Sequence, residues 1–385
     1  MSPSGVASAK PYDQGVRDLV ALTGPAGPRW VDRLTAAWEA GDAVLPVDPR
    51  LPDGAREHLL DVLAPTVVVD TDGHRARRSG GRPVEEGDAL VVATSGTTGE
   101  PKGVVLTHEA VAASARATSA RLGVDPDRHR WLACLPLSHV GGLSVVTRAL
   151  HIGTDLVVHP GFDPEAVTRA ALDGATHVSL VATALGRVDA SLFECIVLGG
   201  AAPPPDRPAN TVATYGMTET GSGVVYDGFP LDGVEVRAVD GELAVRGPML
   251  LRAYRDGTVP LDSHGWLATG DLGSVDPATG RVSVHGRAGD LIITGGENVW
   301  PTPVEAVISG LAEVAEVAIV GRPDPEWGQR VVAIVVPADR SMPPTLDALR
   351  SEVKERLPAF CAPKELELVD SLPRTALGKV IRAGL

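Results

Sequence analysis

Short apolar runs alternate with helix-like segments through the first 220 residues, and this alternation limits the fold more than any other feature. Strand-like runs occur at residues 43–47, 89–93, 131–135, 156–159, 178–181 and 195–198. Helical patterns occupy residues 30–40 and the segment from Thr107, a predicted N-cap, to Gly123, a predicted stop. Short apolar strands separated by helices predict a parallel sheet covered on both faces, and therefore an α/β fold.

The pattern changes after residue 220. Residues 221–286 hold short alternating segments with frequent Gly, Asp and Pro, which predict a small antiparallel sheet or barrel. Past Arg287 we expect a compact α+β unit, with helices at 303–309 and 345–357 and strands at 317–320 and 331–336. We therefore place a boundary near 286–290. It separates an N-terminal domain (1–286, with a β-rich subdomain at 220–286) from a C-terminal domain (287–385).

Charge and hydropathy exclude several classes of protein. The chain has 35 Lys and Arg against 49 Asp and Glu, a net charge of −14, which argues against nucleic-acid and anionic-membrane partners because both are bound through basic patches. The longest clean apolar run, 331–336, is far too short for a membrane span, and residues 1–15 lack the apolar core of a secretory signal. Three widely spaced cysteines favour neither a disulfide framework nor a zinc site. We expect a cytoplasmic globular protein.

The strongest chemical signal is a run of small and hydroxylated residues that we expect between a strand and a helix. It reads Thr94, Ser95, Gly96, Thr97, Thr98, Gly99, Glu100, Pro101, Lys102 and Gly103. Backbone N–H groups of a Gly-rich turn can cradle phosphate oxygens, while the hydroxyls add donors and Lys102 adds charge. The spacing differs from the Walker pattern. The run predicts a phosphate-binding loop of another kind.

This run resembles the phosphate-binding loop of the adenylate-forming superfamily, which includes acyl-CoA synthetases and adenylation domains. Further motifs follow in the family's order, and the resemblance extends from Ala43 to the end of the chain. It implies a large N-terminal domain of stacked αβα sheets, a small β-barrel-like subdomain and a small mobile α+β C-terminal domain. Because the loop begins as early as Thr94, the N-terminal subdomain is abbreviated relative to most members.

The resemblance also implies the residues that bind ATP and magnesium. Tyr215, Gly216, Met217, Thr218 and Glu219 match the motif whose Thr meets the α-phosphate and whose Glu holds Mg²⁺, and a carboxylate suits that hard cation. Asp271 and Arg287 match the pair that binds the ribose hydroxyls. Gly199, Gly200 and Ala201 match the stretch against which adenine stacks.

The C-terminal motifs imply the catalytic and thiol-transfer residues. Lys379 matches the family's catalytic lysine, whose ammonium can bridge the attacking carboxylate and the α-phosphate as negative charge builds in the transition state. Gly289 matches the hinge about which the C-terminal domain turns. Gly295 and Gly296 match the loop facing the pantetheine tunnel, and free CoA is the expected thiol acceptor.

The segment from Pro136 to Ser144 is similar to the substrate-side motif of o-succinylbenzoate–CoA ligases of menaquinone biosynthesis. The resemblance implies that His139 lies near the acyl carboxylate, as a catalytic and substrate-binding residue, with Gly142, Leu143 and Ser144 beside it. This acid is an aryl dicarboxylate, and its second carboxylate needs a partner because burying it unpaired is costly. Our candidate partner is Arg148, although a structural role for this arginine is equally open.

The sequence leaves several alternatives open. Another small aryl- or acyl-CoA ligase, and a protein that loads a carrier protein, would both keep the nucleotide motifs. A non-catalytic nucleotide-binding pseudo-enzyme is a third alternative, and the retention of Lys379, Glu219, Asp271 and Arg287 speaks against it. The sequence also leaves open whether the protein forms a homodimer.

Overall fold

The structure is a computed structural model that describes residues 17–95, 100–201, 203–204, 206–374, 380–382 and 385. The chain forms two compact units. Unit 1 comprises residues 1–224, 231–233 and 247–260, and unit 2 comprises 225–230, 234–246 and 261–385. This division places most of the β-rich part with the C-terminal part, so the boundary near 286–290 stays a prediction from the sequence.

The first sheet of unit 1 is mixed and runs in the order β16-β6-β5-β2-β1-β3-β4. Its strands are β1 (Leu19–Leu22), β2 (Ala43–Pro46), β3 (Val67–Val69), β4 (Arg75–Arg77), β5 (Asp88–Ser95), β6 (Pro101–Thr107) and β16 (Ala253–Tyr254). Strands β5, β2, β1 and β3 are parallel, whereas β4, β6 and β16 are each antiparallel to a neighbour.

The second sheet of unit 1 has a parallel stretch in the order β11-β10-β9-β7-β8. Its strands are β7 (Arg130–Ala133), β8 (Asp155–Val158), β9 (His177–Leu180), β10 (Cys195–Leu198) and β11 (Thr211–Gly216). The hairpin of β12 (Gly223–Tyr226) and β13 (Phe229–Pro230) follows along the chain. Because the five strands are parallel, the loops that follow them leave from one edge of the sheet.

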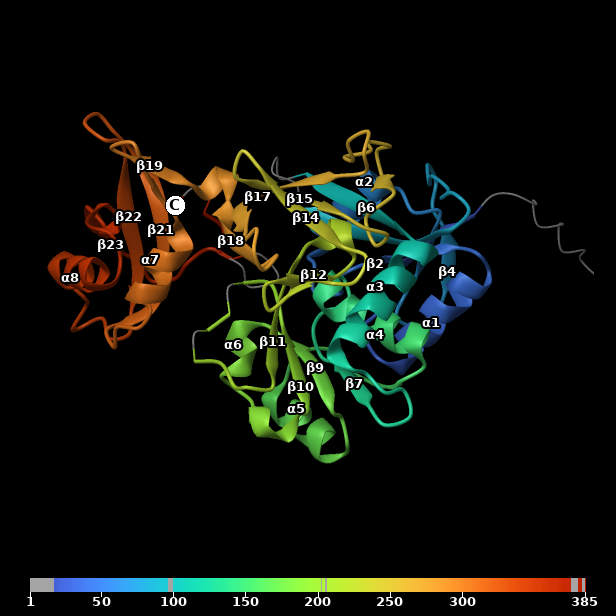
Figure 1. The fold of residues 1–385 in the computed structure, drawn as a ribbon. Coiled ribbons are helices and arrows are strands. Elements are labelled where there is room, and N and C mark those ends of the chain that lie inside the picture. Colours follow the sequence, from blue (N-terminus) through green and yellow to red (C-terminus); the bar gives the residue numbers. More distant parts are fainter. Residues whose placement is uncertain (1–16, 96–99, 202, 205, 375–379, 383–384) are drawn as a thin grey trace, which may run out of the picture. The chain divides into compact units, whose positions relative to one another are not determined.

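Helices cover both sheets of unit 1 (Figure 1). Helix α2 (Asp53–Leu63) packs on one face of the first sheet, and α1 (Pro28–Glu39) packs on β1 and β2. Helix α3 (His108–Leu122) packs on β5 and β6 and against α4 (Val140–Ile152), which packs on β7 and β9. The other face of the second sheet is covered by α5 (Pro164–Leu172), α6 (Ala182–Leu185) and the short 3-10 helix η1 (Ala190–Leu192).

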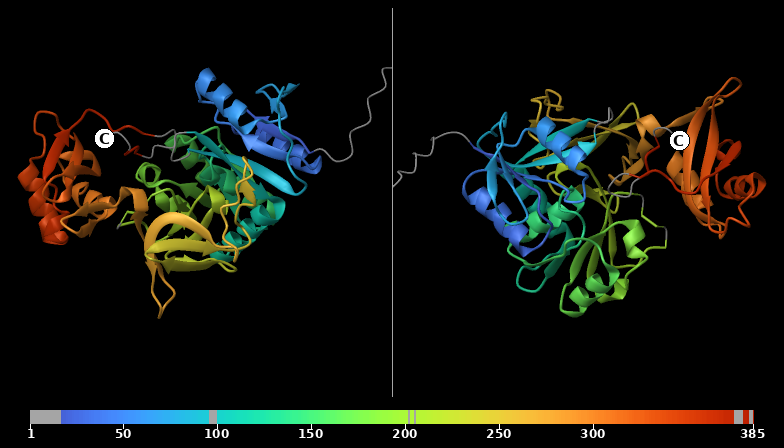
Figure 2. Two further views of the ribbon diagram at one scale, coloured as in Figure 1. Left: turned by 90° about the horizontal axis from the view of Figure 1, so that it is seen from above. Right: turned by 180° about the vertical axis from the view of Figure 1, so that it is seen from behind.

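The described residues of unit 2 form two further sheets. One is antiparallel, in the order β14-β15-β17-β18, built from β14 (Glu235–Val239), β15 (Glu242–Arg246), β17 (Leu267–Val275) and β18 (Val282–Arg287). The other contains β19 (Ile292–Thr294), β20 (Glu297–Val299), β21 (Val314–Asp324), β22 (Gly328–Pro337) and β23 (Glu365–Leu368). Helices α7 (Pro301–Ile308) and α8 (Leu346–Arg356) pack on one face of this second sheet, as the views of Figure 2 show.

Several local predictions are confirmed. The Thr107 side chain accepts a hydrogen bond from Ala110 N at 3.1 Å and so caps α3, and Gly123 ends that helix with a left-handed φ of 63°. The α/β fold with an antiparallel β-rich part and a small C-terminal α+β part is also confirmed. Within the described residues, no helix has the length and apolar character needed to cross a membrane.

One prediction about the phosphate loop is wrong. Thr94 and Ser95 end strand β5, residues 101–103 begin the antiparallel strand β6, and α3 begins only after β6. The short apolar stretch 104–106 forms part of strand β6 because it pairs with β5. The sequence pattern did not predict this strand, because the apolar stretch is only three residues long and lies between Gly103 and the helix cap Thr107.

Candidate active site

The β5–β6 hairpin carries the predicted phosphate loop. Thr94 pairs with Lys102 in the ladder, and the Lys102 side chain is exposed. Gly103 has no room for a side chain, because a Cβ there would lie 2.8 Å from Leu63 Cδ2 and 2.9 Å from Arg255 Cβ. The hairpin is therefore packed tightly at its base. The predicted residues Gly96, Thr97, Thr98 and Gly99 lie outside the described residues, and only the backbone of Ser95 is described.

The predicted magnesium-binding turn follows β11. Residues 218–220 form a short 3-10 helix, η2, and Gly216 sits so close to Ser222 that a Cβ would lie 2.2 Å from its carbonyl oxygen. Thr220 is fully buried, and its Oγ1 accepts from Met217 N at 2.9 Å and lies 2.6 Å from Ser222 O, to which it donates. These contacts fix the backbone on both sides of Thr218 and Glu219.

The Glu219 side chain is held from outside its own turn. Its Oε1 accepts a hydrogen bond from Tyr254 Oη at 2.9 Å, and its main-chain oxygen accepts from Leu251 N at 2.8 Å. Glu219 is half-buried, and a half-buried carboxylate fits the oxygen ligand that Mg²⁺ prefers. Sequence reasoning missed Tyr254, which lies 35 residues after Glu219 with no local pattern to link the two.

The predicted adenine stretch follows β10. Gly200 adopts a left-handed φ of 85°, and a Cβ on Gly199 would lie 3.2 Å from Thr214 Oγ1 on the neighbouring strand β11. The Thr214 hydroxyl donates to Leu198 O at 3.0 Å and ties the ends of β10 and β11 together. Ala201 is exposed. This stretch and the magnesium turn therefore leave neighbouring strands at the same edge of the parallel sheet.

The predicted acyl-side motif leaves the same edge, after β7. His139 is the N-cap of α4, where its carbonyl oxygen accepts from Leu143 N at 2.9 Å. Burial lowers the pKa of His139 to about 4, and the nearby Asp48 carboxylate only partly opposes this shift. Among the described residues, His139 Nε2 has no hydrogen-bond partner. The imidazole is therefore neutral at pH 7.

The start of α4 is packed closely against the preceding loop. A Cβ on Gly142 would lie 2.4 Å from Leu135 O and 2.5 Å from Pro136 O, so only glycine fits there. Leu143 and Ser144 are buried and line a cavity of about 10 Å³ that also borders Thr147. A cavity of this size admits about one water molecule. The direct contact of Leu143 and Ser144 with an acid stays a prediction.

Arg148 lies deeper along α4 and is 2% exposed. Its guanidinium carbon stacks 4.6 Å from the centroid of the Trp131 ring, and Nη2 lies 3.4 Å from Ser222 Oγ, to which it donates. Ser222 follows the magnesium turn directly. The arginine is thus buried next to that turn, and its predicted contact with a second carboxylate stays a prediction.

In unit 2 the predicted ribose pair is in direct contact. Asp271 and Arg287 lie opposite each other in the β17–β18 ladder, and Arg287 Nε donates to Asp271 Oδ1 at 2.9 Å. Arg287 Nη1 also donates to Thr269 O at 2.9 Å. Asp271 is 7% exposed, so its carboxylate is firmly placed. The predicted hinge residue Gly289 follows in the 3-10 helix η3 (Ala288–Asp290).

Gly295 and Gly296 form the two-residue turn between β19 and β20. Their φ angles of 59° and 83° suit a hairpin turn that needs positive φ at both positions. A Cβ on Gly295 would lie 2.7 Å from Trp327 Cε3, and Gly295 N donates to Trp327 O at 2.8 Å. The predicted Gly-rich turn is therefore present. Its position toward CoA stays a prediction.

Lys379 lies outside the described residues, but its chain neighbours are described. Arg374 and Val380 form an antiparallel bridge on either side of it. Arg382 donates from Nη2 to both oxygens of Glu305, at 2.7 and 2.8 Å, and its Nη1 lies 3.5 Å from Asp290 Oδ2. The chain is thus anchored immediately before and after the lysine motif.

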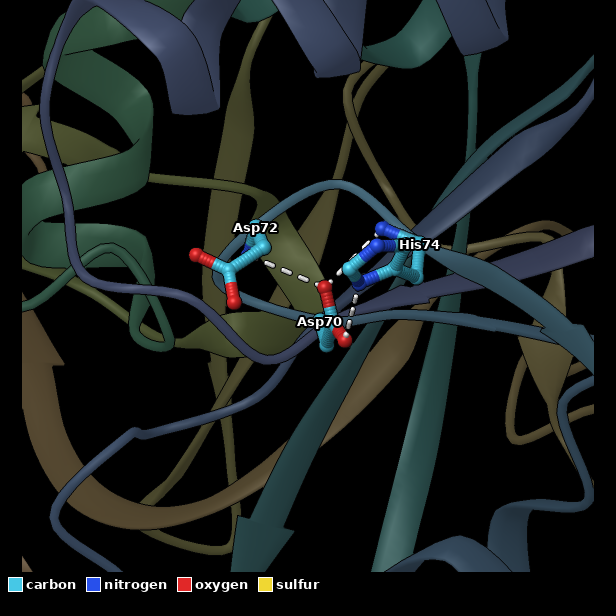
Figure 3. A group of neighbouring side chains, drawn as sticks. All are labelled: Asp70, Asp72 and His74. Atoms are coloured by element: carbon cyan, nitrogen blue, oxygen red, sulfur yellow. Dashed lines mark hydrogen bonds and ion pairs between the residues drawn. The ribbon is translucent and has the colours of Figure 1, made fainter.

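The side chains of Asp70, Asp72 and His74 lie together in the β3–β4 hairpin, as Figure 3 shows. Asp70 Oδ1 accepts from the backbone N–H groups of Asp72 and His74, both at 2.9 Å, and Asp70 Oδ2 lies 3.2 Å from His74 Nδ1. These bonds are those of a tight polar turn. We assign no metal to this group.

Two family models match the chain. The one described as AMP-binding enzyme matches residues 80–299, and the one described as AMP-binding enzyme C-terminal domain matches residues 303–379. The chain belongs to the AMP-binding enzyme family. It is therefore an enzyme of the adenylate-forming class, and the resemblance on which the sequence analysis depends is confirmed.

Relatives within the AMP-binding enzyme family are ligases. A probable 2-succinylbenzoate–CoA ligase of Mycobacterium tuberculosis is 41% identical over 331 residues, which cover 79% of this chain and 85% of the relative. A 2-succinylbenzoate–CoA ligase of Enterococcus faecalis is 33% identical over 338 residues, covering 77% of this chain and 69% of the relative.

Solved structures of AMP-binding enzymes share the fold. The o-succinylbenzoate CoA synthetase of Bacillus subtilis in complex with its acyl-adenylate intermediate superposes with a TM-score of 0.85 at 27% identity, covering 96% of this chain and 88% of that one. The same enzyme in complex with ATP and magnesium gives a TM-score of 0.84 at 28% identity, covering 97% and 90%.

Proposed function

We propose that the chain is an ATP- and CoA-dependent o-succinylbenzoate ligase of menaquinone biosynthesis. The observation that carries the proposal is the edge of the second sheet, from which the acyl-side His139, the adenine stretch after β10 and the Thr218–Glu219 turn all leave. An edge of parallel strands is the usual position of ligand sites in α/β sheets. The named relatives support the choice of acid.

In the first half-reaction, a carboxylate oxygen of the acid attacks the α-phosphorus of ATP, and the bond to pyrophosphate breaks. Glu219 would hold Mg²⁺, which neutralises phosphate charge when bound, and Thr218 would contact the α-phosphate. Lys102 and the loop from Thr94 to Gly99 would bind the phosphates, and Asp271 with Arg287 the ribose. Lys379 would bridge the attacking and transferring groups as charge builds.

In the second half-reaction, the thiol sulfur of CoA attacks the acyl carbonyl carbon and AMP leaves. His139 lies on the acyl side in this proposal. Because burial lowers its pKa to about 4, it presents a neutral ring rather than a second cation near the adenylate. Gly295 and Gly296 would face the pantetheine arm, where the absence of side chains gives the thiol room.

A panel of acids tests the proposal. Pyrophosphate release from ATP is measured with o-succinylbenzoate, benzoate, coumarate and a medium-chain fatty acid, each with and without CoA. The proposal predicts CoA-stimulated turnover chiefly with o-succinylbenzoate. Turnover with another acid would keep the ligase and reject this substrate. Binding of ATP without turnover of any acid would favour the pseudo-enzyme. Acylation of an added carrier protein in place of CoA would favour the protein that loads a carrier.

Two further predictions from the sequence belong to this proposal. A cytoplasmic location fits an enzyme that uses ATP and CoA, and fractionation of cells tests it. The protein is also proposed to form a homodimer, and the mass of the protein in solution tests this oligomeric state directly.

A further inference from the structure

Tyr254 contacts residues of two separate motifs. Its hydroxyl donates to Glu219 Oε1 at 2.9 Å, and Lys102 Nζ lies 5.3 Å from the centroid of its ring. The second distance is within the range of a cation–π interaction. Lys102 belongs to the phosphate-loop hairpin and Glu219 to the magnesium turn. One side chain therefore connects the two elements that bind phosphate and cation in the proposed function.

The backbone around Tyr254 is fixed to both elements. Tyr254 lies opposite Val104 in the β16–β6 pair. Its chain neighbours donate backbone N–H groups as follows: Leu251 to Glu219 O at 2.8 Å, Arg252 to Val105 O at 2.9 Å and Arg255 to Gly103 O at 2.7 Å. The strand β16 is thus hydrogen-bonded to the magnesium turn at one end and to β6 along its length.

Two arginines secure β16 further. Arg252 donates from Nε and Nη2 to the two carboxylate oxygens of Asp88, both at 2.9 Å, and Asp88 is 1% exposed. Arg255 donates to main-chain carbonyls, among them Leu63 O at 3.1 Å and Pro83 O at 2.8 Å. Because these contacts leave β16 little freedom, the Tyr254 hydroxyl is presented to Glu219 from a rigid support.

A carboxylate on a flexible side chain binds a metal ion more tightly when a hydrogen bond holds it in the required orientation. Mg²⁺ demands a nearly ideal octahedral arrangement of oxygen ligands, so a ligand that must first be oriented binds it less well. Groups that hydrogen-bond a metal ligand orient it, and their loss typically costs 10–100-fold in metal affinity. A hydrogen bond to one oxygen of Glu219 leaves the other oxygen available to a cation.

We propose that Tyr254 is a positioning residue for magnesium-bound triphosphate, because its hydroxyl orients the Glu219 carboxylate and its ring holds the Lys102 ammonium. The inference rests on the proposed function for the role of Glu219. It goes beyond that function in adding a residue outside the recognised motifs and a coupling between the loop and the turn.

Binding of a non-hydrolysable ATP analogue tests this role without turnover. Its Kd is measured by calorimetry at saturating Mg²⁺ and in EDTA for the wild type, Tyr254→Phe, Tyr254→Leu and Val259→Ala. Val259 is an exposed residue on the same segment and serves as the matched control. Thermal unfolding of each variant is recorded in parallel to show that it is folded.

Tyr254→Phe keeps the ring and removes the hydroxyl, so we expect Kd to rise about tenfold at saturating Mg²⁺, or about 1.4 kcal/mol, and to stay unchanged in EDTA. Tyr254→Leu should also weaken binding in EDTA, because Lys102 loses the ring. Val259→Ala should match the wild type. An unchanged Kd for Tyr254→Phe, or an equal rise with and without Mg²⁺, would overturn the inference. A wild type that binds magnesium–ATP but turns over no acid would instead count against the proposed function.

Discussion

Arg287 lies directly opposite Asp271 in the β17–β18 ladder, with its Nε 2.9 Å from Asp271 Oδ1. The two residues are 16 positions apart in the sequence, and only the antiparallel register brings them together. Because Asp271 is 7% exposed and Arg287 more open, the arginine holds the carboxylate in one orientation. A carboxylate held in this way is suited to accept two hydroxyl donors at once.

Asp271→Asn should raise the KM for ATP about tenfold or more and change kcat less. A hydrogen bond to a charged group contributes about 1.5–3 kcal/mol, and the neutral amide has one acceptor oxygen where the carboxylate has two. Steady-state kinetics with varied ATP measures this change. Arg246→Ala, which breaks the exposed pair with Glu235 in the same sheet, is the control and should leave the KM unchanged. An equal effect of both substitutions would mean that the sheet was merely disturbed.

Gly103→Ala should lower the free energy of unfolding by about 1–3 kcal/mol, because a Cβ there meets Leu63, Val91 and the Cβ of Arg255 within 3 Å. Denaturant unfolding measures the change. Gly54→Ala is the control, since a Cβ at Gly54 has open space within α2, and it should be neutral or stabilising. If Gly103→Ala were as stable as the wild type, the residues around Gly103 would have to move apart and accommodate the added methyl group at no cost.

Acid should destabilise the fold around His177. This residue is 2% exposed, and burial lowers its pKa from an ordinary 6.5 to about 4, with the neighbouring His129 ring acting in the same direction. Arg148 and Arg128 also lower it, whereas Glu194 opposes the shift. Between these two pH values the unfolded chain binds a proton that the folded chain does not. The free energy of unfolding should therefore fall as pH is lowered from about 6.5 to about 4.

His177→Gln gives the matching test, since glutamine does not titrate in this range. Unfolding by urea at a series of pH values should show a shallower loss of stability below pH 6.5 in this variant than in the wild type. Part of the loss should remain, because the buried His139 shifts in the same direction. Parallel curves for the two proteins would exclude His177 as a cause.

Arg148→Met should raise the KM for o-succinylbenzoate much more than the KM for ATP, if the arginine binds the second carboxylate. Methionine keeps much of the volume beside Trp131 and removes the charge. The ratio of the two KM values is the measurement, because general loss of folded protein lowers the rate and leaves this ratio alone. An unchanged ratio would limit Arg148 to a structural role, in which it stacks on Trp131 and donates to Ser222.

Lys379→Ala should block formation of the adenylate and still allow transfer of a supplied acyl-adenylate to CoA. In the proposed mechanism, Lys379 stabilises the charge that builds as the carboxylate attacks the α-phosphate, and it takes no part in the attack of the thiol on the adenylate. The two half-reactions are measured separately, as pyrophosphate release and as thioester formation. Loss of both to the same extent would reject this division of labour.

Local rules identified much of this chain correctly. Thr107 and Gly123 set the ends of α3 because capping and a left-handed stop are read within a few residues. Four of the five parallel strands of the second sheet, β7, β8, β9 and β10, were visible as apolar runs, whereas β11 was not predicted. The Gly295–Gly296 turn was expected from the family resemblance, and its two glycines suit the positive φ angles found there.

The parts that sequence reasoning missed depend on contacts between distant segments. Strand β6 exists because it pairs with β5, and two-residue β16 exists because it pairs with β6. The contact of Tyr254 with Glu219 depends on both pairings. Likewise, Arg148 could be named as a charged residue near the motif, but its stacking on Trp131 required the packing of α4 on β7.

The most direct test of the proposed function is to identify the products by mass spectrometry. The purified protein is incubated with o-succinylbenzoate, ATP, Mg²⁺ and CoA. We predict o-succinylbenzoyl-CoA and AMP in equal amounts, and the o-succinylbenzoyl adenylate when CoA is left out. Unmodified CoA and acid in a protein that binds ATP, or a thioester formed only with another acid, would contradict the assignment.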